Sequence, residues 1–309
     1  MKVLITGGFG FVGQALTKNF IESGAEVHVL DNMTGISPLA EPLLDKVHHH
    51  AIDITDSEGI KACFLHTKPN LCIHLAAMHY IPACNAHPVK AHTVNVTGTL
   101  NILDGAEKAQ VSHCIILSSG AIYADSRQPL NECTATINPT DIYGLTKWQS
   151  EQLTQYYATK NQAITYTILR LFNVFGPGET NPHILPEIIE QLRQGNTLRL
   201  GNIQPQRDFI HVEDAAQAIC SLAFASNLPH MGIFNVCSGK VFSMAEIIQM
   251  IAQITGRNIE IEADPAKWRT TDKICQMGDP SLLSSQTGFK PTYSFEQGLY
   301  HLLRAENII

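Results

Sequence analysis

Residues 3–13 read VLITGGFGFVG, and the next apolar run, VHVL, ends at Asp31. The first residues of this stretch form a short apolar run that is typical of a buried strand. Gly7, Gly10 and Gly13 follow at G-x-x-G-x-x-G spacing, before an amphipathic stretch that predicts a helix. Glycine is needed where a turn is tight and where main chain must approach a pyrophosphate closely. The stretch therefore predicts a phosphate-binding loop between a strand and a helix.

The position of Asp31 indicates which dinucleotide the loop binds. A helix that starts at such a loop directs free N–H groups and the positive end of its dipole at a phosphate. A carboxylate about 20 residues further on suits the hydroxyls of an adenosine ribose. Its negative charge repels a 2′-phosphate, so the sequence predicts NAD rather than NADP. The residues of this first unit that are expected to contact NAD are Gly7, Gly10, Phe11, Val12, Gly13, Asp31 and Asn32.

Strand-like and helix-like patterns alternate through the first half of the chain. Apolar runs predict strands over 3–6, 26–30, 48–52, 71–75, 114–117 and 165–169. Helical patterns lie between most of them, over 11–23, 57–66, 89–109 and 142–160. Repeated βα units imply a parallel sheet with helices on both faces, so the predicted class is α/β with a doubly wound, Rossmann-type sheet. Ligands of such sheets bind beyond the carboxyl ends of the strands.

Proline and glycine become frequent after about Leu171, so the local composition of the sequence changes there. Helical patterns in this half cover 184–193, 212–225, 245–255 and 295–304. We interpret 1–170 as an NAD-binding domain and 171–309 as a smaller, interleaved C-terminal lobe that holds the substrate. A strand-like run over 233–236 is expected to rejoin the main sheet, within a segment of about 207–237 that returns to the first domain.

The composition excludes several classes of protein. Of the 309 residues 44 % are hydrophobic, which suffices for a large core or two lobes. The net charge is −7 without a basic stripe, which argues against nucleic acid, and no apolar run reaches the ~18 residues of a membrane span. The eight cysteines form no CxxC pair, and with no signal peptide expected they suit a reduced, cytoplasmic protein. Neighbouring residues of a strand point to opposite faces, so the run His48-His49-His50 does not predict a metal site.

Tyr143 and Lys147 form a Y-x-x-x-K pair within the predicted helix 142–160. Residues four apart share a helix face, so the Lys147 ammonium is expected to lower the pKa of the Tyr143 phenol. A phenolate beside a nicotinamide can accept a hydroxyl proton while hydride leaves the same carbon. Ser118 and Ser119 follow the strand at 114–117. Ser119 is expected to hydrogen-bond the same substrate hydroxyl, unless these serines only turn the chain.

Taken together, a series of motifs resembles the extended short-chain dehydrogenase/reductases, in the nucleotide-sugar epimerase/dehydratase branch that includes UDP-glucose 4-epimerase-like enzymes. In chain order, the motifs are the glycine motif, Asp31, Asp53-Ile54, His74–Ala77, Asn95–Thr99, the serine turn, Tyr143/Lys147, Arg170–Pro177 and Arg207–Asp214. Their common order along nearly the whole chain makes the resemblance specific.

The resemblance implies Tyr143 as catalytic base and acid, Lys147 on the nicotinamide ribose, and Ser119 as partner of the reacting hydroxyl. It places Asp53 and Ile54 beside the adenine. The other residues that it implies along NAD are Leu75, Ala76, Ala77, Ser118 and, in a supporting position, Asn95. The residues that it implies around a nucleotide-sugar substrate are His79, Tyr80, Ser119, Ala121, Asn173, Arg207 and, by a weaker match, Arg269. The arginines offer planar forks that suit a diphosphate.

The two residues after Ser119 bear on the reaction. Dehydratases of the family usually carry an Asp-Glu pair there, and decarboxylases usually keep a glutamate. Gly120 and Ala121 stand at these positions and cannot transfer protons. The loop from Met78 to Cys84 also departs from the family pattern. His79, Tyr80 or Cys84 either supplies an additional acid or base or only shapes the pocket.

These observations predict an NAD-dependent epimerase of a nucleotide-activated sugar, acting at C4 through a transient 4-keto sugar. The alternative is a nucleotide-sugar 4-ketoreductase, and a dehydratase or a non-catalytic NAD-sensing protein fits the residues less well. A UDP-sugar is favoured, with dTDP-, GDP- and CDP-sugars as further candidates. The resemblance also implies a homodimer, formed through the helices predicted at 89–109 and 142–160.

Overall fold

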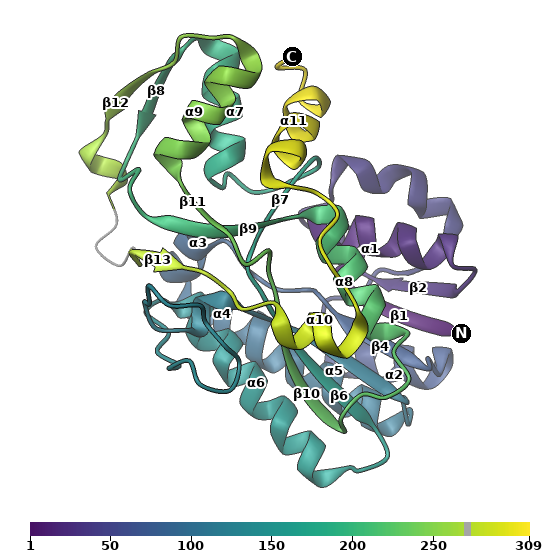
Figure 1. Cartoon of the computed structure of the whole chain (residues 1–309). Coiled ribbons are helices and arrows are strands. Elements are labelled where there is room, and N and C mark those ends of the chain that lie inside the picture. Colours follow the sequence, from purple (N-terminus) through teal and green to yellow (C-terminus); the bar gives the residue numbers. More distant parts are fainter. Residues whose placement is uncertain (269–272) are drawn as a thin grey trace.

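The computed structural model describes residues 1–268 and 273–309, with a seven-stranded parallel sheet at its centre (Figure 1). The strands of this sheet are, in spatial order, β10 (Met231–Val236), β6 (Thr165–Leu171), β5 (His113–Ser119), β4 (Leu71–His74), β1 (Lys2–Thr6), β2 (Glu26–Leu30) and β3 (His48–His50). The chain leaves β1 first toward β2 and β3 and then crosses to β4 on the other side. The predicted doubly wound α/β class is therefore confirmed.

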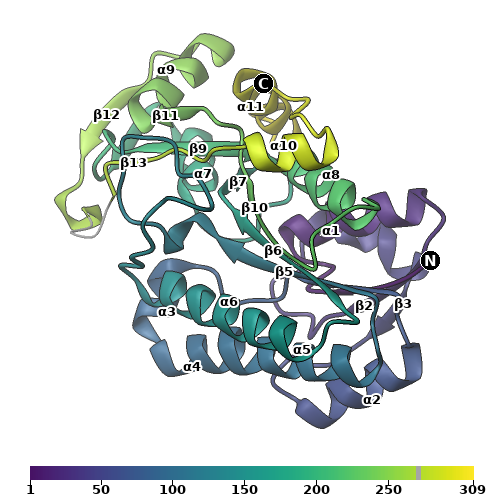
Figure 2. The same cartoon turned by 60° about the horizontal axis from the view of Figure 1, so that its bottom comes forward.

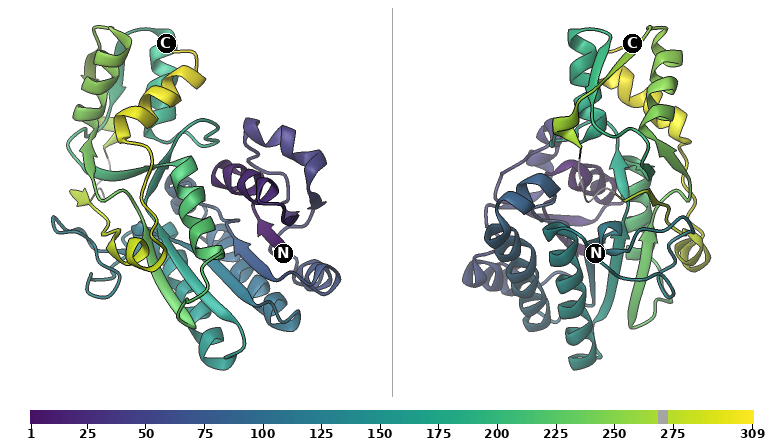
Figure 3. Two further views of the ribbon diagram at one scale, coloured as in Figure 1. Left: turned by 45° about the vertical axis from the view of Figure 1, so that its right-hand side comes forward. Right: turned by 90° about the vertical axis from the view of Figure 1, so that its left-hand side faces the viewer.

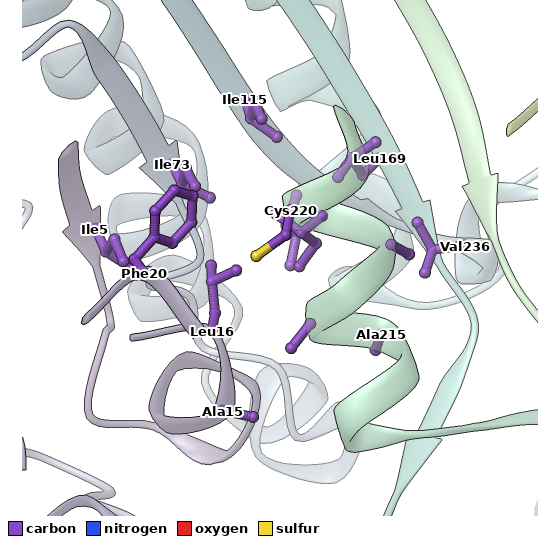
Figure 4. Packing of buried hydrophobic residues seen from close by; sticks show 14 of the residues in the cluster. Ile5, Ala15, Leu16, Phe20, Ile73, Ile115, Leu169, Ala215, Cys220 and Val236 are labelled. Carbon is purple, nitrogen blue, oxygen red and sulfur yellow. The ribbon is translucent and has the colours of Figure 1, made fainter. Parts of the chain in front are cut away.

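Helices cover both faces of this sheet because its strands are apolar on both sides. Val3 and Ile5 of β1 pack on one face, and Leu4 packs on the other. The first face is covered by α1 (Phe11–Glu22), α8 (Val212–Ala223) and α10 (Ser281–Thr287), and Figure 4 shows this core. The second face is covered by α2 (Ser57–Thr67), α5 (Gly98–Lys108) and α6 (Ile142–Lys160), which are side by side in Figure 2. Each fully buried aliphatic side chain contributes about 1.5–3 kcal/mol.

The helix predicted over 89–109 is interrupted. It consists of α4 (Pro88–His92), a π-helical turn (Thr93–Thr97) and α5, and a short helix, α3 (Ile81–Ala86), precedes it. A π-turn inserts one extra residue per turn and shifts the side chains that follow. Periodicity alone does not reveal such a turn, and this one contains Asn95.

A second, smaller core lies under three further helices at the top of Figure 1, which Figure 3 shows from two other sides. The helices are α7 (Ile184–Gln194), α9 (Met244–Thr255) and α11 (Phe295–Ala305). Short strands accompany them: β9 (Gln206–His211) pairs with β7 (Asn173–Phe175), β11 (Val241–Ser243) and β13 (Cys275–Gln276), and β8 (Thr197–Leu200) pairs with β12 (Glu260–Ala263). The described part of this lobe thus mixes helices with narrow sheets.

The chain passes between the two lobes more than once. β10 joins the main sheet beside β6, so the strand predicted over 233–236 is confirmed. Within the segment 207–237, however, residues 207–211 belong to β9 of the small lobe. Arg207 and Asp208 pair with β11, and Phe209–His211 pair with β7, so the expectation that the segment returns to the first domain is wrong for this part. Only α8 and β10 return.

Short 3-10 helices complete the fold: η1 (Pro38–Lys46), η3 (Gly120–Ile122) and η4 (Pro265–Lys267). Strand β3 ends at His50, two residues earlier than predicted. Among the helices of the described ranges, none combines the length and the apolar character that a membrane span requires.

Candidate active site

The glycine loop closes against the carboxyl ends of β1 and β4. Gly7 has a φ of +68°, and a Cβ at this residue would lie 2.9 Å from the main chain of Ala76. A Cβ on Gly13 would lie 2.0 Å from the Gly7 carbonyl oxygen. Both positions therefore require glycine. Helix α1 begins at the loop, and Gly10 at its N-cap leaves the first N–H groups uncapped. The loop and the helix start thus fit the pyrophosphate of a dinucleotide.

Asp31 lies where β2 ends, beside this loop. Its Oδ2 accepts a hydrogen bond from the Phe9 main-chain N–H at 3.2 Å, and its Oδ1 accepts one from Met33 at 2.9 Å. A carboxylate has about four acceptor positions, so both oxygens can still accept bonds from ribose hydroxyls. Burial raises the pKa of Asp31, while the two N–H groups act in the opposite direction.

The residues predicted beside the adenine gather at the same edge of the sheet. Asn32 Nδ2 donates to Asp53 Oδ2 at 2.6 Å, which joins the end of β2 to the segment after β3. The next residue, Ile54, is buried, and its carbonyl accepts a hydrogen bond from Asn101 Nδ2 at 2.9 Å. The structure therefore brings Asn32, Asp53 and Ile54 together.

Asn95 holds the segment that leaves β4. The Leu75 and Ala76 N–H groups donate to the Thr6 carbonyl, both at 3.1 Å. Asn95 Oδ1 then accepts from the Met78 N–H at 2.8 Å, and its Nδ2 donates to the Met78 carbonyl at 2.9 Å. The Asn95 side chain is buried and holds this segment in place.

Ser119, Tyr143 and Lys147 meet at the carboxyl end of β5, where α6 begins. Asp141 caps α6, and its carboxylate accepts a main-chain N–H of the first turn at 2.7 Å. The Ser119 side chain hydrogen-bonds that of Tyr143. Lys147 Nζ is buried and donates to the Leu117 carbonyl at 2.7 Å. The predicted trio is thus assembled by one strand end and one helix start.

The pKa of Tyr143 is shifted in the direction opposite to the prediction. Desolvation by burial raises it to about 12, against the opposing effect of the Ser119 hydrogen bond. Burial also lowers the pKa of Lys147 to about 8. The expectation of a lowered phenol pKa is therefore wrong for the protein without its cofactor, because desolvation of the phenolate outweighs the Ser119 hydrogen bond that favours it.

A buried ion pair below the trio was not predicted from the sequence. Arg170 donates from Nε to Glu151 Oε1 at 3.0 Å and from Nη2 to Oε2 at 2.8 Å. Ser118 Oγ donates to the same carboxylate at 2.5 Å, so its hydroxyl points toward the ion pair. Ser118 could therefore contact a cofactor only through its main-chain atoms. Glu151 lies four residues after Lys147, on the same helix face as Tyr143, and this i, i+4, i+8 spacing was the available signal.

The small lobe contributes the residues predicted for the diphosphate. Asn173 Nδ2 donates to the Asp208 carbonyl at 3.1 Å, and Arg207 Nη1 donates to the Lys273 carbonyl at 2.7 Å. Asn173 and Arg207 lie on the neighbouring parallel strands β7 and β9. Arg269 lies outside the described residues.

Lys273, which was not predicted, ties the small lobe to the serine turn. Its Nζ donates to the Ala121 carbonyl at 2.7 Å and to the Tyr123 carbonyl at 2.5 Å. The side chain is buried, and burial lowers its pKa to about 8. Ala121 is therefore placed at the junction of the two lobes.

The loop after β4 packs against residues 179–183 of the small lobe. His79 Nε2 pairs with Asn181 Nδ2 at 3.1 Å, and the rings of His79 and Tyr80 each lie 5.7 Å from that of His183. The Cys84 thiol donates to a main-chain carbonyl at 3.2 Å, and burial raises its pKa to about 11. These contacts favour a role in shaping the pocket, and they argue against Cys84 as an acid or base at neutral pH.

With residues 3–237 matched by the sequence model of the NAD dependent epimerase/dehydratase family, the chain belongs to that family. Its cofactor is NAD, as the glycine loop and Asp31 predicted. Membership of this family also supports the prediction that the protein is an enzyme of this class.

Three similar proteins illustrate the range of the family. A GDP-6-deoxy-D-mannose reductase from Pseudomonas aeruginosa is 30 % identical, over 98 % of this chain and 96 % of its own. A UDP-glucose 4-epimerase from Neisseria meningitidis serogroup B is 28 % identical, over 94 % and 92 %. The solved UDP-glucose 4-epimerase from Thermotoga maritima, with UDP-glucose, is 25 % identical, covers 99 % of both chains and has a TM-score of 0.91.

Proposed function

We propose that the protein is an NAD-dependent epimerase that inverts C4 of a nucleotide-activated sugar. The observation that carries this proposal is the hydrogen-bonded pair Ser119–Tyr143 beside buried Lys147, at the same sheet edge as the glycine loop. The turn that follows Ser119 holds Gly120 and Ala121, which offer no carboxylate for eliminating water. The chain therefore has the groups for reversible oxidation of a carbinol and lacks, at these positions, those for dehydration.

The chemistry follows from what each side chain can do. Ser119 holds the C4 hydroxyl, and Tyr143 accepts its proton as C4 becomes a ketone. NAD⁺, when bound, supplies the hydride acceptor and a positive charge that favours the phenolate. The 4-keto sugar turns over in the pocket, and Tyr143 returns the proton after the opposite face of C4 has been reduced. Lys147 stabilises the phenolate and binds the nicotinamide ribose.

We assign the cofactor and substrate contacts as the sequence suggested. Asp31 accepts the adenosine ribose hydroxyls, and Asn32, Asp53 and Ile54 border the adenine. Asn173, Arg207 and Arg269 receive the diphosphate, since amide and guanidinium groups donate to phosphate oxygens. A UDP-sugar is favoured because similar epimerases act on UDP-glucose.

The second candidate is a nucleotide-sugar 4-ketoreductase. The observation that favours it is the similarity to the GDP-6-deoxy-D-mannose reductase, which covers nearly the whole of both chains. The same Ser119–Tyr143 pair can donate a proton to a ketone. In this case reduced cofactor is consumed rather than recycled.

One experiment separates the two candidates. The protein is incubated with catalytic NAD⁺ and UDP-, dTDP-, GDP- or CDP-sugars, and proton NMR follows the anomeric signals. A second stereoisomer at equilibrium establishes the epimerase and identifies its substrate. Turnover that requires a 4-keto sugar and stoichiometric reduced cofactor establishes the reductase instead.

Tyr143→Phe provides the matched control for this experiment. We expect it to lower kcat by at least about 10²-fold, because it removes the proton-transfer group, while NAD is still bound. Fluorescence titration with NAD checks that the cofactor site is intact. Undiminished turnover in this variant would exclude Tyr143 as the acid and base.

We also propose a cytoplasmic homodimer. The eight cysteines are all free thiols, which fits a reducing compartment. Helices α4, α5 and α6 lie together along one side of the molecule and expose Val89, Leu100, Leu145 and Tyr156 (Figure 2). An apolar surface of this kind fits a second copy of the same chain.

A further inference from the structure

Three histidines and a glutamate gather at the free edge of the central sheet, outside the candidate active site. They lie on β2 and on β3, which is the last strand of the sheet. The register pairs His28 with His48, and Leu30 with His50. Because side chains alternate along a strand, Glu26 and His28 of β2 share one face with His48 and His50 of β3.

This arrangement changes how the run His48-His49-His50 is interpreted. Alternation within one strand directs His49 to the other face, where its Nε2 pairs with the Asp31 carbonyl at 3.1 Å. Strand β2 runs parallel to β3, so residues paired across the two strands, such as His28 and His48, have their side chains on the same face. Alternation along a single strand gives no reason to expect a cluster, because the cluster also needs the neighbouring strand.

The distances within the cluster suit a metal ion. One ligand atom each from Glu26, His28 and His48 lie within 4.8 Å of one another. His28 Nε2 is 3.1 Å from Glu26 Oε1, and the rings of His28 and His48 are stacked with their centroids 4.6 Å apart. Tetrahedral zinc, with bonds of about 2.1 Å, needs ligand atoms about 3.4 Å apart. Glu26 and His48 are exposed, so their side chains are free of core packing and can rotate toward an ion.

His50 completes the arrangement by orienting His28. The His28 side chain is only 8 % exposed, and its Nδ1 pairs with His50 Nε2 at 2.9 Å. A metal-binding imidazole needs such a partner on its second nitrogen, because the partner determines the tautomer and the ring plane. His28 is thus held with Nε2 directed toward Glu26, while the other two groups remain accessible to an ion from solvent.

We propose that Glu26, His28 and His48 bind a divalent transition-metal ion, with zinc as the first candidate, and that His50 positions His28. Imidazole and carboxylate ligands suit zinc, and water takes the fourth position. The ion links β2 to β3, and β3 also holds Asp31 in place, because the Asp31 N–H donates to the His50 carbonyl at 3.1 Å. The site therefore secures the edge strand next to the predicted ribose-binding residue. This metal-site proposal does not depend on the proposed epimerase reaction.

Lys2 opposes the ion and offers a sharp test. Its Nζ lies 3.0 Å from Glu26 Oε1, so a metal must displace this ion pair and tolerate the nearby ammonium. Lys2→Met removes the competitor while retaining most of the side-chain volume. We expect zinc to bind severalfold more tightly to this variant. Unchanged or weaker binding overturns the assignment of Glu26 as a ligand.

The main test measures zinc binding by isothermal titration calorimetry on the full chain after chelator treatment. We expect one ion per chain and a melting temperature that rises with zinc concentration. His48→Ala should lower the affinity more than about 100-fold, and His50→Ala about 10–100-fold. His92→Ala removes an exposed histidine of α4 and should change nothing.

The variants keep the result interpretable. His48 is exposed, so its replacement leaves the core intact, and circular dichroism checks the fold. The proposal is overturned by the absence of stoichiometric binding to the wild-type chain. It is equally overturned if His48→Ala and His92→Ala weaken binding alike, since zinc would then occupy scattered histidines.

Discussion

At the scale of single residues, the site is governed by competition between burial and charge. Tyr143 must lose a proton to act as a base, yet its surroundings raise the pKa of the phenol to about 12. Lys147 is the nearest predicted source of positive charge, but burial lowers its own pKa to about 8. The free protein therefore keeps the tyrosine protonated at neutral pH. Cofactor binding is the event expected to shift this balance, because it adds a positive charge beside the phenol.

This balance predicts a cofactor-dependent titration of Tyr143. An ordinary tyrosine is half ionised at about pH 10, whereas a phenol with a pKa of about 12 remains almost fully protonated there. The near-ultraviolet difference between wild type and Tyr143→Phe should show no phenolate at about pH 10 without cofactor. Addition of NAD⁺ should make the phenolate signal appear at lower pH. A half-ionised Tyr143 in the free protein would contradict the raised pKa.

The ion pair between Glu151 and Arg170 is expected to matter for stability. Both side chains are almost fully buried, at 0 % and 4 % exposure. Glu151→Gln leaves a buried guanidinium without its countercharge, so we expect a loss of about 3–5 kcal/mol in the free energy of unfolding. Urea denaturation measures this loss. The control is Glu107→Gln, which breaks the more exposed pair with Lys160 and should cost far less, because solvent screens that pair. Equal effects would show that burial of the pair is unimportant.

At the scale of elements, the cofactor loop depends on contacts between main-chain atoms. The turn between β1 and α1 brings Gly13 so close to Gly7 that no side chain fits between them. The segment after β4 also approaches Gly7 closely, since a Cβ on Gly7 would lie 2.9 Å from the main chain of Ala76. Asn95 holds that segment from the π-turn between α4 and α5. Three elements therefore determine the shape of one loop.

Gly13→Ala tests this packing. The added methyl group would lie 2.0 Å from a main-chain oxygen, which cannot move without displacing the loop. We expect at least about 1–3 kcal/mol of destabilisation and a marked loss of NAD affinity. Thermal denaturation and NAD titration measure the two effects. Gly195→Ala is the matched control, because a Cβ at Gly195 meets nothing within 4 Å and should leave both quantities unchanged. NAD binding of wild-type strength in Gly13→Ala would contradict the tight approach.

At the scale of the whole molecule, the small lobe packs beside the candidate site. The chain crosses between them through β7, β9 and β10, and Lys273 anchors the small lobe to the serine turn. The His79–Asn181 contact is a second junction. Together these junctions connect the small lobe to the loop after β4 and to the serine turn.

The exposed side of α4, α5 and α6 predicts a dimer. Leu145 and Tyr156 are eleven residues apart, about three helical turns, and therefore lie on one face of α6. We expect sedimentation to give twice the chain mass, and the double variant Leu100→Glu, Leu145→Glu to give a monomer, because charges would be buried at the interface. Ile261→Glu, on exposed β12 of the small lobe, should remain dimeric. A monomeric wild type would contradict this proposal.

The sequence by itself determined most of the elements and the cofactor loop. Strand β2 and helix α6 have the predicted bounds, 26–30 and 142–160, because local periodicity and capping act over a few residues. The glycine spacing and Asp31 predicted the NAD loop for the same reason, since the residues that shape it are close in the chain.

Only the tertiary structure decided which distant residues meet. Glu151 and Arg170 come from a helix and a strand, and Lys273 reaches a carbonyl 150 residues away. The cluster of His28 and His48 depends on the register of two strands. The direction of the Tyr143 pKa shift depends on everything packed around the phenol, because desolvation sums over all neighbours. Such quantities arise from contacts between remote segments, and these contacts exist only once the chain has folded.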